Sequence, residues 1–309
     1  MENNFNKTLF GYKDLFKEFV DIYNSNSLPN KILLSGKKGI GKCTFANHFI
    51  NYIFSKNDEF KYNLDKNEID INNKSYKLIN SYTHPNFFKI SLNKEKKNID
   101  ILQVREMINF ANKSTFNNKE KIILIDDCEY LNKNSSNALL KIIEEPNNDL
   151  LFLLIFDSKK KITNTLKSRC VEFKFNLNIE YISEIVNSVF KENIFNKISK
   201  DFIYYSNSPL NYINFINLCN SFNLDYTNIE IDELIKFILK NKLIIKKNLS
   251  NDDIKYYLDI FFIKKIELFK NNYYFDLFSY FNKKYRLISK FNLDFDSYLL
   301  EFKSKMINE

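Results

Sequence analysis

The sequence predicts an α/β nucleotide-binding protein of the P-loop class, with a parallel sheet followed by helices. Two apolar runs, Lys121–Ile125 and Leu150–Phe156, have the composition of strands that are buried on both faces. The first run ends in two acids, Asp126 and Asp127, at the end of a strand where open α/β sheets place their ligands. A glycine-rich loop at Gly36–Thr44 lies upstream, as a phosphate-binding sheet requires.

The elements before the central strand follow from hydrophobic spacing. Helical periodicity over Phe10–Tyr23 precedes a short strand at Lys31–Leu34, and a second helix is predicted at Phe45–Phe54. Residues 55–83 are polar with little periodicity, which favours an irregular insert on the rim. A further strand is predicted at Phe87–Ile90. His84, just before that strand, is interpreted as a structural turn residue rather than a catalyst.

The glycine-rich loop fits the pattern G-x-x-x-x-G-K-[ST] except at its last position, which is Cys43. Glycines allow backbone N–H groups to close around phosphate oxygens, and Lys42 supplies a positive charge. The chain has only four glycines, so three of them in this loop argue against a chance turn. The predicted nucleotide-binding residues are Gly36, Gly39, Gly41, Lys42, Cys43, Thr44 and Asp126.

The middle of the chain supplies two helices and the last strand. Ile101–Phe110 is helical in spacing, with Gln103 and Arg105 on its polar side. The spacing over Leu131–Glu145 predicts a helix that Pro146 ends, because proline cannot continue the hydrogen-bond ladder. A final strand is predicted over 171–175.

Beyond residue 178 the sequence predicts helices alone. Three short helices at 179–190, 198–205 and 210–222 would form a small α domain. Three longer ones at 231–243, 252–269 and 273–290 are rich in Phe, Tyr and Ile. Their aromatic faces are expected to form core or subunit contacts.

From the composition we also expect a soluble, cytoplasmic protein with reduced cysteines. We expect neither a membrane span nor a signal peptide. The net charge of +8 favours a nucleic-acid partner only slightly. The chain is rich in Lys, Asn, Ile, Phe and Tyr throughout, a bias typical of an AT-rich genome, and its lysines are not gathered in one block.

In their order, these motifs resemble the AAA+ clamp-loader ATPases of bacterial DNA polymerase III. The resemblance rests on six segments: Gly36–Thr44, His84–Asn86, Ile101–Arg105, Ile123–Glu129, Asn137–Pro146 and Ser168–Cys170. It implies an AAA+ αβ nucleotide-binding domain over 1–176, a helical lid over 177–226 and a helical collar over 227–309. It also implies a hetero-pentameric ring of clamp-loader subunits that places a sliding clamp on primed DNA.

Where the sequence departs from the motor subunits of that family, it resembles the family's delta-prime subunits. Cys43 replaces the Mg²⁺-binding hydroxyl, Asp127 stands at the usual glutamate, and Leu210 replaces a lid arginine. Asp157 occupies the Asn/Thr sensor position, and the motors' zinc-binding cysteine quartet is missing. We therefore expect ATP and Mg²⁺ to bind weakly, ATPase activity to be weak or absent, and no zinc to bind; Asp127 stays a minor catalytic candidate.

Arg169 is the main catalytic candidate, and it is one of only three arginines in the chain, with Arg105 and Arg286. The resemblance implies that the arginine of Ser168–Cys170 reaches into a neighbouring subunit's ATP site as a trans-acting finger. A plain surface ion pair is the alternative role for this residue. For the whole chain, the alternatives are a gamma/tau-type motor ATPase of the same ring or an unrelated AAA+ ATPase such as a helicase loader.

Overall fold

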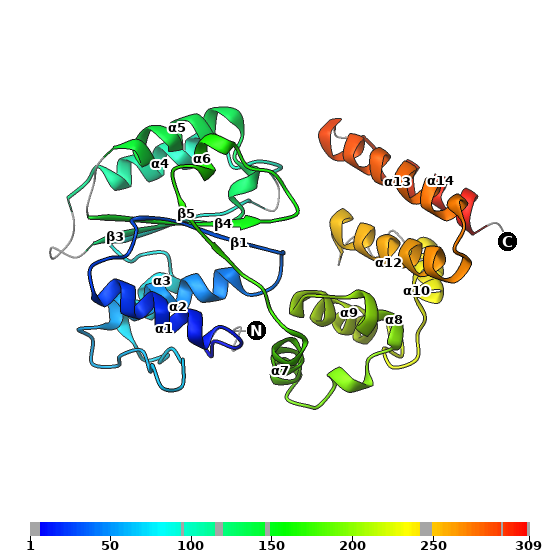
Figure 1. The fold of residues 1–309 in the computed structure, drawn as a ribbon, viewed down its shortest axis with the longest axis horizontal. Coiled ribbons are helices and arrows are strands. Elements are labelled where there is room, and N and C mark those ends of the chain that lie inside the picture. Colours follow the sequence, from blue (N-terminus) through cyan, green and yellow to red (C-terminus); the bar gives the residue numbers. More distant parts are fainter. Residues whose placement is uncertain are drawn as a thin grey trace. The chain divides into compact units, whose positions relative to one another are not determined.

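A five-stranded parallel sheet organises the first part of the chain in the computed structural model (Figure 1). The strand order is β2-β3-β4-β1-β5. Their bounds are β1 Lys31–Gly36, β2 Phe87–Ile90, β3 Lys121–Ile125, β4 Leu150–Asp157 and β5 Val171–Lys174. Every predicted strand is present, and the predicted parallel sheet is confirmed.

The structure describes residues 7–93, 96–114, 120–145, 149–241, 249–291 and 293–307. It divides into two compact units. The first unit holds residues 1–189 together with Ser208–Leu210, and the second holds residues 190–207 and 211–309. Each is described by itself.

Helices cover both faces of the sheet, with α1, α2 and α3 on one face and α4, α5 and α6 on the other (Figure 1). Their bounds are α1 Lys13–Asn24, α2 Lys42–Ser55, α3 Lys74–Asn80, α4 Ile101–Ala111, α5 Lys133–Glu144 and α6 Asn164–Lys167. A short 3-10 helix, η3 at Cys128–Tyr130, follows β3, and α7 at Ile179–Phe190 ends the unit.

Side chains of the central strands alternate between two hydrophobic cores. Ile122 and Leu124 of β3 point into the core beneath α1 and α2, whereas Ile123 and Ile125 point into the core beneath α4 and α5. All eight residues of β4 are buried. This two-sided burial explains why β3 and β4 read as continuous apolar runs rather than as an alternating pattern.

The segment 55–83 is more ordered than its polar sequence indicates. It contains helix α3, and Tyr62, Ile69 and Ile79 are buried in the first core. The expectation of an irregular rim insert is therefore wrong for this part of the segment. Short polar side chains make its hydrogen bonds, which hydrophobic periodicity does not detect.

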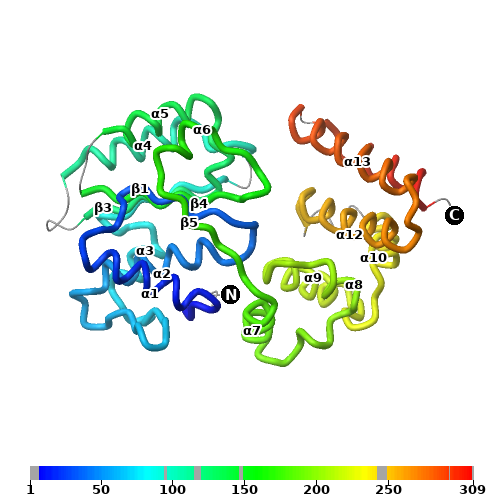
Figure 2. The backbone as a smooth tube through the Cα atoms, in the orientation of Figure 1, coloured from blue at the N-terminus to red at the C-terminus, as the bar shows by residue number. Residues whose placement is uncertain are grey.

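The second unit consists of helices in the part of the chain described (Figure 2). They are η4 Phe195–Lys197, α8 Lys200–Tyr205, α9 Pro209–Ser221, α10 Ile231–Lys240, α12 Asn251–Phe269, α13 Asn272–Phe291 and α14 Phe295–Met306. The predicted helices are present in the described residues, although positions 242 and 243 of the predicted helix 231–243 lie outside them. Helix α14 is an additional one that the sequence did not predict. No helix among the described residues is long and apolar enough to cross a membrane.

Aromatic rings fill the core of the second unit. Phe202 of α8 stacks on Phe215 of α9 with ring centroids 3.6 Å apart. Phe262 of α12 packs against Phe281 of α13 and Phe302 of α14, at 5.7 and 5.6 Å. Aromatic pairs in these geometries contribute beyond their buried area.

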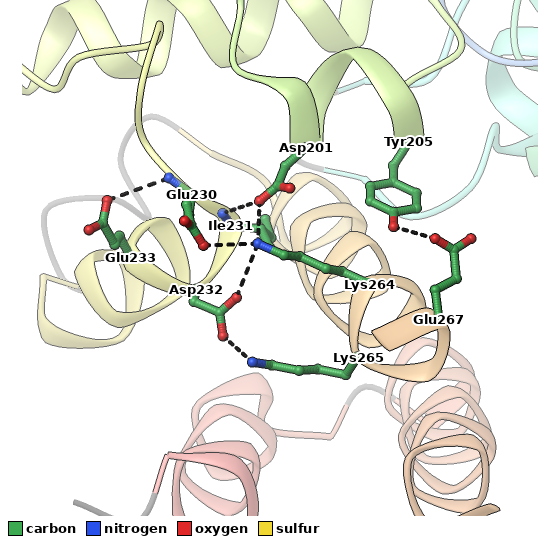
Figure 3. Close-up of polar contacts among 9 residues, drawn as sticks. All are labelled: Asp201, Tyr205, Glu230, Ile231, Asp232, Glu233, Lys264, Lys265 and Glu267. Atoms are coloured by element: carbon green, nitrogen blue, oxygen red, sulfur yellow. Dashed lines mark hydrogen bonds and ion pairs between the residues drawn. The ribbon is translucent and has the colours of Figure 1, made fainter. Parts of the chain in front are cut away.

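An ion-pair network on Lys264 of α12 joins three elements of this unit (Figure 3). Its Nζ lies 2.8 Å from the Asp201 carboxylate of α8 and 3.0 Å from Glu230, the residue before α10. Asp232 of α10 lies 2.5 Å from Lys265. Asp201 also accepts the Ile231 backbone N–H at 3.0 Å. Helices on both sides of the predicted lid–collar boundary at 226/227 therefore belong to one compact unit, while the three-domain division stays a prediction.

Candidate functional site

The glycine-rich loop connects β1 to α2 at the carboxyl edge of the sheet. Gly39 and Gly41 have φ angles of +80° and +95°, which L side chains rarely adopt. Gly41 is the N-cap of α2, so the loop leads directly into the amino end of that helix. The buried Tyr12 hydroxyl donates to the Ile40 carbonyl at 2.8 Å, and this bond connects the loop to the residue before α1. The loop thus has the backbone shape of a phosphate-binding loop.

Lys42 is bonded to the carbonyls of its own loop. Its Nζ donates to Gly36 O and to Lys37 O, both at 2.7 Å, and only 5% of the residue is exposed. Gly36 O also accepts the Ser158 backbone N–H at 3.1 Å, so both of its lone pairs have donors. Burial lowers the pKa of Lys42, against the opposing effect of nearby carboxylates, of which Asp157 is the largest. Two of the three ammonium protons are thereby occupied.

Leu210 lies directly on the glycine-rich loop. Its backbone N–H donates to Gly39 O at 3.4 Å. A Cβ placed on Gly39 would be only 2.5 Å from the Leu210 Cβ, so the two residues are in close contact. The segment Ser208–Leu210 belongs to the first unit for this reason. An apolar side chain therefore lies against the loop at the position where the resemblance expects an arginine.

Cys43 places a sulfur at the loop position where the motif has a hydroxyl oxygen. Its sulfur lies 3.8 Å from Lys89 Nζ and 3.8 Å from Asn47 Nδ2. Burial, reinforced by the negative charge of Asp126, raises the pKa of the thiol to about 12. Magnesium prefers oxygen ligands in octahedral geometry, and a neutral thiol is a poor substitute for a hydroxyl. Thr44 follows in the first turn of α2, one position beyond the ligand position.

Several carboxylates gather at the ends of β3 and β4. The pairing of β1 with β4 sets Asp157 beside Gly36. Asp127 follows β3 with φ +58°, and burial, followed by the charge of Asp126, raises the pKa of its carboxyl group. Glu129 accepts the Asp157 backbone N–H at 3.3 Å, and burial raises the pKa of Glu129. This cluster balances the charge of Lys42.

Two residues of this site were missed in the sequence. Lys89 of β2 lies 4.0 Å from the Asp126 carboxylate and contacts Cys43, and Glu129 interacts electrostatically with Lys42. A single lysine in a strand and a glutamate after an acid pair have no distinctive spacing. Lys89 could have been found only from the parallel pairing of β2 with β3. That pairing sets Ile90 beside Ile125 and so brings Lys89 close to the acids that follow β3.

Arg169 lies between α6 and β5, and its guanidinium has partners on α5 and α6. Its Nη2 lies 2.6 Å from Glu144 Oε1, and its Nη1 donates to Thr165 O at 2.9 Å. The Arg169 side chain remains 38% exposed. The structure therefore brings together Gly36, Lys42, Cys43 and the acids, and places Arg169 in a different environment. Pro146, predicted to end α5, lies outside the described residues, and α5 ends at Glu144.

A groove of about 580 Å³ lies between α4 and α5 of the first unit. Its lining mixes charged, amide and apolar side chains, namely Arg105, Lys141, Glu145, Asn112, Asn134, Asn137, Ile101, Ile108, Ala138 and Ile142. Guanidinium, ammonium and amide groups are the usual partners of nucleic-acid phosphates and bases.

Comparison with known proteins gives a family. The family described as "DNA polymerase III, delta subunit" matches residues 11–178. The chain is 31% identical over 140 residues to the DNA polymerase III subunit delta' of Pseudomonas aeruginosa, which covers 45% of this chain and 41% of that protein. It is 30% identical over 162 residues to the corresponding subunit of Buchnera aphidicola subsp. Baizongia pistaciae, covering 50% of this chain and 46% of the relative.

A subunit of a second type also matches. The chain is 30% identical over 199 residues to the DNA polymerase III subunit gamma/tau of Mycoplasma genitalium. That match covers 64% of this chain and 32% of the relative. In each of these three relatives, the matched part spans less than half of the protein's length.

Proposed function

Because the chain belongs to the DNA polymerase III delta and delta-prime clamp-loader family, we propose that it is a delta-prime-type subunit of a bacterial clamp loader. In this role it would act in DNA replication in the cytoplasm. It would join other clamp-loader subunits in a hetero-pentameric ring that opens a sliding clamp and places it on primed DNA.

The observation that carries the proposal is the pair of departures at the glycine-rich loop, Cys43 in the loop and Leu210 against it. Cys43 supplies no oxygen ligand, and Leu210 lies against Gly39. We therefore propose weak ATP binding and negligible hydrolysis by this chain alone.

Two measurements test this assignment. Steady-state ATP hydrolysis by the isolated chain should stay at background, with and without primed DNA. Pull-down of the chain from its native cell should recover the polymerase, the sliding clamp and the other loader subunits. Robust turnover by the isolated chain would instead favour a gamma/tau-type motor. Recovery of a helicase without the clamp would favour a helicase loader.

We also propose that Arg169 is a finger supplied to the ATP site of a neighbouring subunit. A guanidinium offers a planar fork of donors that an ammonium cannot copy, and this one is exposed. Fingers of this kind contribute ~10³–10⁵ in rate at the site they enter. Arg169→Ala should leave the chain folded and the ring assembled, while ring ATPase falls in part and clamp loading falls further.

Arg169→Lys is the matched variant for this prediction, since it keeps the charge and loses the fork. The ring ATPase of Arg169→Lys should be nearly as low as that of Arg169→Ala if the fork geometry is required. It should equal that of the wild type if charge alone is required. An unchanged ring ATPase in Arg169→Ala, whatever its melting temperature, would remove Arg169 from the mechanism. Arg169 would then have only the alternative role of a surface ion-pair partner of Glu144.

A further inference from the structure

The guanidinium of Arg169 is held at two points from two different helices. Glu144, the last residue of α5, binds Nη2 at 2.6 Å, and the Thr165 carbonyl of α6 accepts from Nη1 at 2.9 Å. The backbone around it is also fixed, because the Arg169 N–H donates to Leu166 O at 3.3 Å and Leu166 is buried in the second core. Both ends of this long side chain are therefore anchored to the body of the first unit.

The two anchors leave donors available. A guanidinium has five N–H donors in a fixed plane, and the two contacts use one on each terminal nitrogen. Among the described residues the other three donors have no partner, on a side chain that is 38% exposed. A phosphate oxygen can therefore bind to the fork while Glu144 still holds it.

The contact with Glu144 contributes little to folding. The Glu144 side chain is 51% exposed, and exposed ion pairs contribute little to stability. Glu144 also places a negative charge at the carboxyl end of α5, where the helix dipole disfavours it. An arginine that is free to rotate loses rotamer entropy when it binds. An anchor that restricts the side chain beforehand reduces that loss.

We propose that Glu144 is the positioning residue that orients Arg169 toward the neighbouring ATP site. This inference rests on the proposed finger role of Arg169. Glu144 does not contact the phosphate itself. It acts through the guanidinium, by fixing the direction in which the three remaining donors point.

The test uses the reconstituted clamp loader with one active ATP site, the one next to Arg169. Four versions of this chain are compared with the wild type: Arg169→Ala, Glu144→Ala, Glu144→Gln and the double variant Arg169→Ala/Glu144→Ala. An exposed ion pair biases the orientation of a side chain by no more than about fivefold. Glu144→Ala should accordingly lower kcat several-fold, up to about that factor, with KM for ATP unchanged. Glu144→Gln should retain most of the rate, since its amide oxygen still accepts from Nη2.

The double variant separates positioning from a structural role. It should turn over as slowly as Arg169→Ala alone, because without the guanidinium there is nothing for Glu144 to orient. Lys167→Met is the matched control. It removes another ion pair of α6, the 3.0 Å contact between Lys167 and Glu172, and leaves the contacts of Arg169 in place. Its ring ATPase should equal that of the wild type.

The outcomes distinguish this inference from the function on which it rests. An Arg169→Ala ring with normal kcat would overturn the finger role and the inference with it. A slow Arg169→Ala ring combined with a normal Glu144→Ala ring would overturn the inference alone. So would an additional loss in the double variant, because Glu144 would then act independently of Arg169. A faster Glu144→Ala ring would mean that the carboxylate competes with phosphate, and it too would overturn positioning.

Discussion

At the scale of single residues, the glycine-rich loop departs from the P-loop motif by one atom at Cys43. Cys43 has a sulfur where the motif has a hydroxyl oxygen, and burial raises the pKa of that thiol to about 12. The neighbouring Asp126, Lys89 and Asn47 are already in place around it. One substitution should therefore change metal dependence without changing the fold.

Cys43→Ser should increase ATP affinity in the presence of Mg²⁺ by roughly tenfold, because a hydroxyl returns one oxygen ligand and a single charged contact is worth ~1.5 kcal/mol or more. Isothermal titration with ATP, with and without Mg²⁺, measures this change. Cys43→Ala is the matched control, since it removes the sulfur and adds no ligand. An equal gain in both variants would show that space rather than coordination limits binding.

At the scale of elements, hydrophobic patterns predicted most of the fold and few of the side-chain contacts. The apolar runs of β3 and β4 and the glycines of the loop are local signals, so the strands and the loop could be read directly. Helix α3 and the buried part of the insert depend on hydrogen bonds instead. The contacts of Lys42 with its own loop and of Arg169 with Glu144 depend on side-chain conformations that no spacing encodes.

The insert between α2 and β2 is held together by Asn73, the N-cap of α3. Its amide nitrogen donates to Asp58 at 3.0 Å and to Phe60 O at 2.5 Å, and its amide oxygen accepts the Tyr76 N–H at 2.7 Å. Ser75 contributes a further bond to the same Asp58 carboxylate at 2.7 Å. Asn73→Ala should destabilise the protein by ~1–3 kcal/mol, because the cap is lost and buried polar groups lose their partner.

Urea unfolding measures that loss as a lower midpoint with an unchanged slope. Asn72→Ala is the control, because it replaces an exposed side chain and keeps the backbone bond from Asn72 N–H to Asp70. If both variants unfolded at the wild-type midpoint, the Asn73 bonds would not hold the insert.

Helices α13 and α14 are joined through Glu301, whose pKa is lowered to about 2, chiefly by hydrogen bonds from Lys284 and Tyr280. Lys305 adds a contact at 3.0 Å. A carboxyl group with a lowered folded-state pKa stabilises the fold at pH above its ordinary value of 4.5. The Glu301 contribution should therefore be complete above pH 4.5 and disappear as pH falls toward about 2.

Urea midpoints of the wild type and Glu301→Gln, compared at several pH values, check the direction. The wild-type advantage should shrink between pH 4.5 and about 2, since glutamine does not titrate. An advantage that stays constant through this window would contradict the assigned pKa.

At the scale of the whole molecule, the two units should differ in how they tolerate truncation. The first unit contains the entire sheet and both of its helical layers, so a fragment ending at residue 189 should fold cooperatively. A fragment ending at residue 228 should aggregate, because Phe202 would lose its contact with Tyr257 of α12 and Asp201 would lose Lys264. Neither fragment should join the clamp loader if the aromatic-rich helices beyond residue 229 form its collar.

Size-exclusion chromatography and thermal melting compare the two fragments, and pull-down with the partner subunits tests assembly. Normal assembly of the shorter fragment would refute the collar assignment. A monomeric, cooperatively melting 1–228 fragment would show that the network on Lys264 is not needed to hold α8 and α9.

The interleaved path of the chain has a consequence for how such proteins can be recombined. The chain leaves the first unit after Val189, returns for Ser208–Leu210, and leaves again. A chimera that exchanges everything after residue 189 for a homologue's sequence would therefore also replace the residue that lies on Gly39. An exchange at that junction would change a residue that contacts the glycine-rich loop. The loop and the residues after 189 should therefore be taken from the same parent protein.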